Sequence, residues 1–167
     1  DIRVGSPVAN RQRVEAQGIV SLFENTLVLA SNIDGRATVA HILAQVRAVT
    51  LGAQANQDLP FEQLVEALQP ERSLSHNPLF QVVYNHQQQD HGALDSLPGL
   101  RSESLDCRGE SAQFDLVLGT LELADGSFEA YLDYATDLFE ARSIVRMAGQ
   151  FLRVLEAVCE TPRLTLA

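Results

Sequence analysis

The spacing of apolar residues in the first third of the chain alternates between strand and helix. The ranges 2–9 and 26–30 are rich in β-branched residues, which predicts two strands. A polar turn at 10–13 and a short helical stretch at 14–22 separate them. Beyond Thr38, apolar residues recur every three or four positions, which predicts a helix capped by the hydroxyl of that threonine.

A second helix and a buried strand are predicted in the middle of the chain. Apolar residues over 61–68 fall on one stripe, with Asp58 as a plausible N-cap and Pro60 in the first turn. A polar elbow at 69–78 ends this helix. The run 79–84 is apolar at alternate and at intervening positions, which predicts a central strand covered on both faces.

The last third predicts a meander followed by a helix. The expected elements are a loop at 90–99, strands at 100–107, 114–123 and 127–134, and an amphipathic helix over 141–158. Asp125 and Gly126 form the expected hairpin turn between the last two strands. The whole pattern is that of a mixed α/β domain.

Composition narrows the classes of function. A chain of 167 residues that is 46% hydrophobic can form one domain around its own core. No apolar run approaches the ~20 residues of a membrane span, so we expect a cytoplasmic protein, cut from a longer one because no Met begins it. A net charge of -10 argues against nucleic acid as a partner. Cys107 and Cys159 are expected to be reduced thiols.

Three motifs follow one another along the chain: 19–27 (Ile-Val-Ser-Leu-Phe-Glu-Asn-Thr-Leu), 56–62 (Asn-Gln-Asp-Leu-Pro-Phe-Glu) and 72–79 (Arg-Ser-Leu-Ser-His-Asn-Pro-Leu). In this order they resemble the condensation domains of nonribosomal peptide synthetases. The sequence departs from the family pattern at Ser21, Glu24, Ser73 and His76. The residues that match the motifs, expected to have structural roles, are Asn25, Thr26, Gln57, Asp58, Pro60, Phe61, Glu62, Arg72, Asn77 and Pro78.

The resemblance implies a fold similar to chloramphenicol acetyltransferase, with two lobes and a mixed central sheet flanked by helices. It implies amide-bond formation between thioesters held on the phosphopantetheine arms of peptidyl carrier proteins. The catalytic signature of that family, His-His-x-x-x-Asp-Gly, is absent from the chain, whose four histidines are never adjacent. We therefore expect residues 1–167 to be the C-terminal lobe, inactive alone. Its expected partners are the N-terminal lobe, the carrier proteins and a downstream adenylation domain.

A lobe without the catalytic histidine can still supply a wall of the substrate tunnel between the lobes. The candidates are Asn85 and His86, where the 79–84 strand ends, and Asp115 in the strand that starts at Phe114. A hydrogen-bonded structural role is the alternative for each. No ligand spacing for a metal is present, and no residue is assigned as catalytic.

Several other interpretations stay open. Asp58 and Glu62 suit the start of a helix, where the dipole favours negative charge, and Arg72, Asn77 and Pro78 are expected to shape the elbow. Asp133 with Asp137, and Arg11 with Arg13, are interpreted as charges of solvated turns. Heterocyclisation and epimerisation domains have the same fold, and a non-catalytic module that docks carrier or adenylation domains is a further alternative.

Overall fold

The computed structural model describes residues 1–70, 76–88, 98–99, 111–161 and 165. The strands are β1 (Ile2–Val8), β2 (Asn25–Ser31), β3 (Val82–Gln88), β4 (Leu116–Glu122) and β5 (Phe128–Tyr134). The helices are α1 (Val14–Gln17), α2 (Val39–Ala55), α3 (Phe61–Leu68) and α5 (Ala141–Glu160). None of these described helices is both long and apolar enough to cross a membrane.

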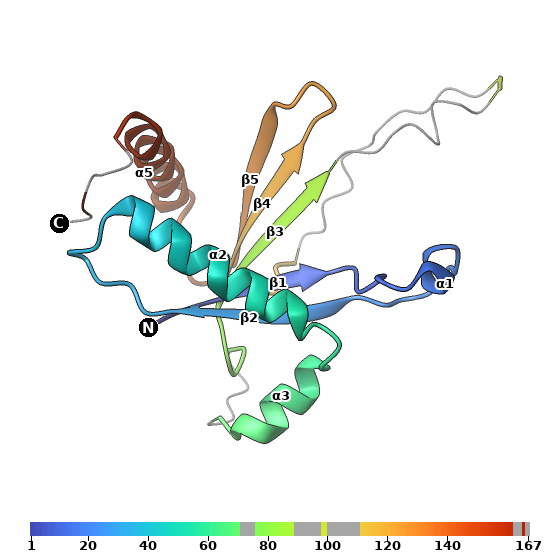
Figure 1. Ribbon diagram of the computed structural model, residues 1–167. Helices are drawn as coiled ribbons and strands as arrows, with labels where there is room; N and C mark the ends of the chain where they lie inside the picture. Colours follow the sequence, from blue (N-terminus) through green and yellow to red (C-terminus); the bar gives the residue numbers. More distant parts are fainter. Residues whose placement is uncertain (71–75, 89–97, 100–110, 162–164, 166–167) are drawn as a thin grey trace.

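The five strands form one mixed sheet in the order β2-β1-β3-β4-β5 (Figure 1). β2 is antiparallel to β1, and β5 is antiparallel to β4, whereas β3 is parallel to both of its neighbours. β1 and β3 pair only through Val4 with Val82 and Gly5 with Val83, and they diverge beyond that point. The predicted mixed sheet flanked by helices is confirmed. The divergence of the two strands opens the sheet next to Pro7.

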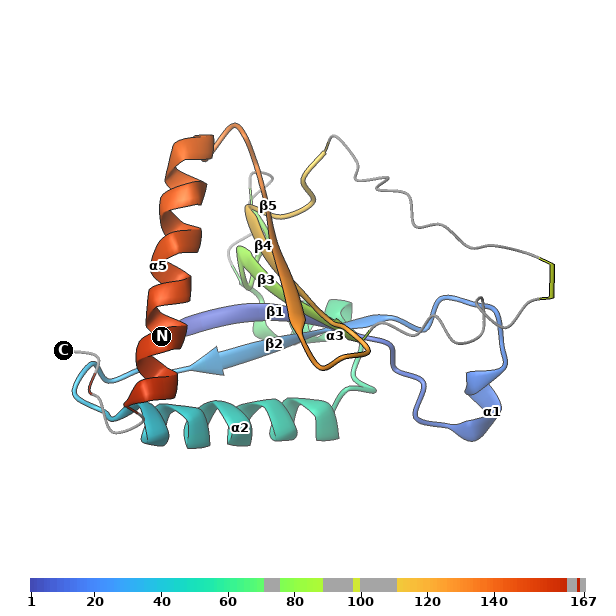
Figure 2. The ribbon, with the colours of Figure 1, turned by 90° about the horizontal axis from the view of Figure 1, so that it is seen from above.

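Helices α2 and α5 lie on one side of the sheet, and the other side is largely uncovered by helices (Figure 2). The best-buried side chain is Phe80, 1% exposed, in a cluster with Leu79 and Val83. The rings of Phe61 and Phe114 flank it, each with its centroid 5.7 Å from that of Phe80. This aromatic cluster joins α3 to the centre of the sheet, so the core rests on side chains from distant parts of the sequence.

The glycine at position 5 is required by this core. The edge of the Phe80 ring lies where a side chain on Gly5 would begin, because the strand passes directly against the ring. Phe80 is too deeply buried to move aside. Gly5 therefore fixes where β1 can pack.

The N-cap predicted from the sequence is found for α2 but not for α3. The Thr38 hydroxyl accepts a hydrogen bond from the amide of His41 at 3.3 Å, so the predicted cap of α2 is confirmed. Asp58 does not cap α3, since the chain remains extended through Pro60, which takes the N-cap position itself. The helix predicted over 14–22 is a single turn that stops before Gly18.

The predicted central strand is displaced along the chain. It occupies Val82–Gln88 instead of 79–84, because β4 pairs with it continuously from Val82 opposite Leu116 to Gln88 opposite Glu122. It is not covered on both faces: Val83 is buried, whereas Val82 and Tyr84 are 37% and 36% exposed. Backbone pairing thus extends the strand through polar residues that looked like a strand end.

Part of the predicted tail is seen and part lies outside the described residues. Asp125 and Gly126 form the hairpin turn, in which Gly126 adopts a φ of 81° and the amide of Leu123 donates to the carbonyl of Ser127 at 2.8 Å. The last helix is confirmed as α5. Arg72, most of the predicted 90–99 loop, Cys107 and the predicted 100–107 strand lie outside the described residues.

Candidate functional site

Asn25, at the start of β2, connects two of the sequence motifs. Its Nδ2 donates to the carbonyls of Gln57 and Leu59, each at 2.8 Å, and its Oδ1 accepts from the amide of Phe61 at 3.1 Å. This side chain satisfies the first free amide of α3, the role that Asp58 was expected to have. The 19–27 and 56–62 motifs are therefore one structural unit.

A small hollow of about 240 Å³ lies where these motifs meet. Most of its lining is supplied by residues that match the family motifs, namely Asn25, Thr26, Asp58, Pro60, Phe61 and Glu62. Gln57, next to them, is the buried polar residue of the described chain, 8% exposed. The structure thus brings together seven of the ten motif residues singled out in the sequence.

Asn77 connects the third motif to the core. Its Oδ1 accepts from the amides of Leu79 at 3.1 Å and Phe80 at 3.4 Å, which turns the chain sharply after Pro78. The turn directs Leu79 and Phe80 into the buried cluster, where Phe80 contacts Phe61 of the second motif. The expected role of Asn77 in shaping the elbow has this physical basis.

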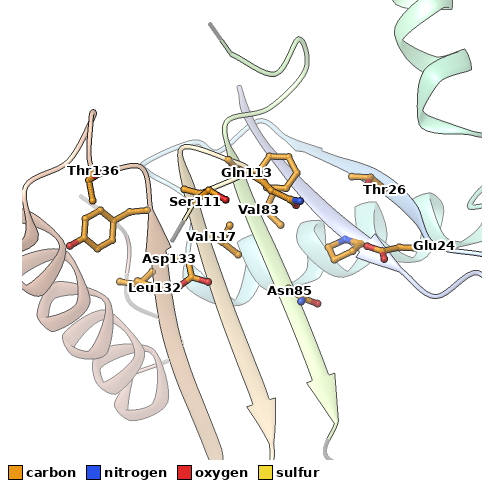
Figure 3. A pocket seen from close by; sticks show the side chains of 14 residues that line it. Glu24, Thr26, Val83, Asn85, Ser111, Gln113, Val117, Leu132, Asp133 and Thr136 are labelled. Atoms are coloured by element: carbon orange, nitrogen blue, oxygen red, sulfur yellow. The ribbon is translucent and has the colours of Figure 1, made fainter. Parts of the chain in front are cut away.

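A larger cavity of about 720 Å³ lies on the open face of the sheet (Figure 3). Asn85 of β3 lies at one end of it, with Glu24 on one side and Asp133 of β5 on the other. The floor is apolar at Val83 and Val117. The rest of the lining is mixed: Thr26, Ser111, Gln113 and Thr136 are polar, whereas Pro7, Ala112, Phe114 and Leu132 are apolar. The cavity offers amide, hydroxyl and carboxylate groups above an apolar floor.

His86 belongs to the opposite face of β3, because successive side chains of a strand alternate. Its Nδ1 is 3.0 Å from the Thr120 hydroxyl, which is also 3.0 Å from the Tyr84 hydroxyl. Its ring lies 6.2 Å from that of Phe128, and its Nε2 is 3.9 Å from Glu122. The side chains of Asn85 and His86 thus leave opposite faces of β3, yet both line a hollow of about 360 Å³ beside the arm of chain that precedes β2. Of the two, Asn85 also lines the larger cavity, and the expectation that both face one tunnel stays a prediction.

Asp115 also differs from expectation. It precedes β4 instead of lying within it, and its carbonyl accepts from the amide of Ala135 at 3.0 Å. It is absent from the lining of the cavity. This bond holds the start of β4 against the end of β5, which favours the structural alternative for Asp115.

Two carboxylates of the cavity were not identified as site residues from the sequence. Glu24 stood out only as a departure from the family motif. Asp133 was interpreted as a turn charge, but it lies within β5 opposite Val117. The sequence did contain a clue to the position of Asp133. It follows Tyr131 by two residues, so in a strand both side chains lie on the same face.

Among the described residues, none of the histidines at 41, 76 and 86 lines the cavity. Within the described residues, no cluster of three potential metal ligands occurs. The groups at this site can hydrogen-bond a substrate and interact with its charge. General base catalysis at neutral pH calls for a group such as histidine, and the described lining residues include none.

Comparison with known proteins agrees with these motifs. The family model described as "Condensation domain" matches residues 1–167. The chain belongs to the condensation-domain family. It is 43% identical over 164 residues to a linear gramicidin synthase of Brevibacillus parabrevis, a match that covers 97% of this chain but 2% of that protein.

Solved structures of condensation-family proteins share the fold. A four-domain nonribosomal peptide synthetase, holo-AB3403 bound to AMP and glycine, matches with a TM-score of 0.86 at 25% identity, over 99% of this chain and 14% of that one. The condensation domain of the monacolin K polyketide synthase MokA matches with a TM-score of 0.81 at 19% identity, over 99% of this chain and 38% of that one. The α/β fold expected from the resemblance is confirmed, and this chain corresponds to a minor part of each match.

Proposed function

We propose that residues 1–167 belong to the C-terminal lobe of a condensation domain that forms amide bonds during nonribosomal peptide synthesis. In this reaction the amine of the acceptor attacks the thioester carbonyl of the donor. A C–N bond forms, the C–S bond breaks, the amine loses a proton and the donor arm keeps a free thiol. The observation that carries the proposal is the cavity around Asn85, in a chain whose full length matches the family.

The role of this lobe is to position substrate, because the described residues that line its cavity include no histidine. Asn85 can donate to and accept from an amide or thioester group that lies over Val83 and Val117. Glu24 and Asp133 face the same space and favour a positively charged or proton-donating group there. The base comes from the other lobe, as the absence of His-His-x-x-x-Asp-Gly from this chain implies.

The partners follow from this role. Peptidyl carrier proteins deliver both substrates on phosphopantetheine arms, and an adenylation domain lies downstream. The polar lining of the cavity fits the amide groups of such an arm: Thr26, Ser111 and Gln113 carry hydroxyl or amide groups that can both donate and accept. The arm itself supplies the thioester. We place the protein in the cytoplasm with these partners.

The test is a chimaera in which this chain replaces the matching residues of the linear gramicidin synthase, giving a complete condensation domain that we call the chimaeric domain. With donor and acceptor loaded on carrier proteins, it should form the amide product, detected by mass spectrometry. The isolated chain should form none. A chimaeric domain that folds, binds both carriers and yields no amide would contradict the proposal.

A further inference from the structure

Tyr131 of β5 lies across the backbone of β4 at Gly119. The two residues are directly opposite each other in the antiparallel pairing of these strands. The far end of the tyrosine side chain, with its Cζ and hydroxyl, occupies the place where a side chain on Gly119 would begin. Gly119 is buried, unlike the other residues of β4. Glycine at this position therefore allows the ring to lie over the strand.

The side chain of Tyr131 also points toward Asn85. In the sheet, β4 lies between β3 and β5, and Gly119 pairs with Asn85 on one side and with Tyr131 on the other. Residues that are paired across neighbouring strands have their side chains on the same face of the sheet. Because its hydroxyl end has crossed to Gly119, the tyrosine extends from β5 toward the end of the cavity that Asn85 lines.

The ring of Tyr131 ends the cavity along β4. The preceding row of paired residues on this face includes Val83 and Val117, which form the cavity floor (Figure 3). In the row that contains Tyr131, Asn85 alone lines the cavity. The next row on the same face includes Leu121, which is partly buried. The ring thus separates the space over Val117 from the space over Leu121.

From this geometry we infer that Tyr131 is a specificity-determining residue, whose ring sets the length of the cavity and so limits the side chain of the aminoacyl group that lies against Asn85. The inference rests on the proposed function. A larger apolar side chain would need the surface between Val117 and Leu121 that the ring occupies. Differences of this kind in an apolar pocket change selectivity by about 10-fold to 200-fold.

The experiment lets alanyl and phenylalanyl groups compete for the chimaeric domain. Both are loaded on carrier proteins, first as acceptors and then as donors, and the two amide products are quantified by mass spectrometry. Tyr131→Ala removes a ring of similar size to that of the phenylalanyl group. We therefore expect the ratio of phenylalanyl to alanyl product to rise at least about tenfold in one of the two positions, which identifies the substrate that lies against Asn85. An unchanged ratio in both positions would overturn the inference.

Two control variants separate the size of the ring from other effects. Tyr131→Phe keeps the ring and loses the hydroxyl, so it should keep the product ratio of the unaltered domain. Glu129→Ala removes an exposed side chain from the same face of β5, two residues away, and should also leave the ratio unchanged. A change in Tyr131→Phe as large as that in Tyr131→Ala would assign the preference to the hydroxyl and contradict the role of the ring.

The position of the ring is tested without turnover. Gly119→Ala places a methyl group where the end of the Tyr131 side chain lies, so the thermal midpoint of the chimaeric domain should fall by about 2 °C or more. In the Tyr131→Ala background the same substitution should have less than half this effect, because the ring is gone. Equal falls in the two backgrounds would contradict the placement of the ring and overturn the inference.

Binding separates a failure of this inference from a failure of the proposed function. The dissociation constants of the alanyl-loaded and phenylalanyl-loaded carrier proteins do not depend on turnover, and Tyr131→Ala should shift their ratio toward the phenylalanyl group. A shifted binding ratio in a domain that forms no amide would contradict only the proposed function. Amide formation with an unchanged product ratio would contradict only the role of Tyr131.

Discussion

At the scale of single residues, two asparagines connect the family motifs to the fold. Asn25 joins β2 to the start of α3 through three hydrogen bonds, and Asn77 turns the chain so that Leu79 and Phe80 enter the core. An amide side chain suits both places, because it can donate and accept at once. These contacts explain the presence of Asn in the motifs without giving it a chemical role.

Replacing Asn25 by Ala should lower the free energy of unfolding of the chimaeric domain by about 2 kcal/mol, since each of three lost hydrogen bonds contributes about 0.5–1.5 kcal/mol. Urea denaturation provides the measurement. Asn56→Ala is the matched control: its Nδ2 donates to the carbonyl of Gly52 from an exposed position, so its loss should cost well under half as much. Equal effects of the two substitutions would contradict the linking role of Asn25.

Asn77 makes a different prediction, because only its oxygen is used towards Leu79 and Phe80. Asn77→Ala should destabilise the domain by about 1 kcal/mol, and Asn77→Asp should restore most of that loss, since a carboxylate oxygen accepts the same two amide hydrogens. Thermal unfolding of the unaltered domain, Asn77→Ala and Asn77→Asp measures these differences in stability. An Asp variant as unstable as the Ala variant would show that the turn depends on something else.

The hairpin turn allows a pH prediction. Hydrogen bonds from the hydroxyl and the amide of Ser127 hold the pKa of Asp125 below its usual value. A carboxyl group with a lowered pKa in the folded state stabilises the fold above its unfolded pKa, and this contribution is lost as pH falls through the folded pKa. NMR titration should show a lowered pKa for Asp125 that rises in Ser127→Ala. An unchanged pKa in that variant would contradict the assigned cause.

At the scale of secondary-structure elements, the packing of β1 depends on the close approach of its backbone at Gly5 to the Phe80 ring. Gly5→Ala should destabilise the chimaeric domain by about 1–3 kcal/mol, because the new methyl group meets the buried Phe80 ring. Gly52→Ala, inside α2 with open space around it, should instead stabilise by about 0.5–1 kcal/mol. Urea midpoints should therefore move in opposite directions. A shift of the same sign for both would contradict this packing.

The elements that local sequence predicts well are those with local causes. The Thr38 cap, the Asp125–Gly126 turn and the amphipathic α5 each depend on residues close together in sequence. The bounds of β3 do not, because pairing with β4, more than thirty residues later, extends the strand through Gln88. The cap of α3 comes from Asn25 for the same reason: its cause is distant in sequence.

The candidate site likewise has features with local causes and features with causes distant in the sequence. The change to polar residues at 85–89 singled out Asn85 and His86, on the expectation that the strand ends before them, whereas β3 continues to Gln88. Once β3 includes both, alternation separates them. Glu24 directly precedes β2, and Asp133 lies in β5. Only the order of the strands in the sheet reveals that the two residues flank Asn85.

At the scale of the whole molecule, we propose that the chain forms one wall of a reaction chamber. Helices α2 and α5 lie on one side of the sheet (Figure 2). The cavity that Asn85 lines lies on the other side, where α3 packs against the cluster that contains Val83. In the proposed account, this face positions substrate and the catalytic base comes from the other lobe.

The most direct test of this account is the rate of amide formation by the chimaeric domain carrying Asn85→Ala, with His86→Ala as the comparison from the opposite face of the same strand. Loss of a hydrogen bond to substrate at Asn85 should lower turnover by about tenfold to a hundredfold, with an unchanged thermal midpoint. His86→Ala should stay within about threefold of the unaltered domain. An unaltered rate for Asn85→Ala, or a fall matched by an equal fall for His86→Ala, would contradict the assignment of the cavity.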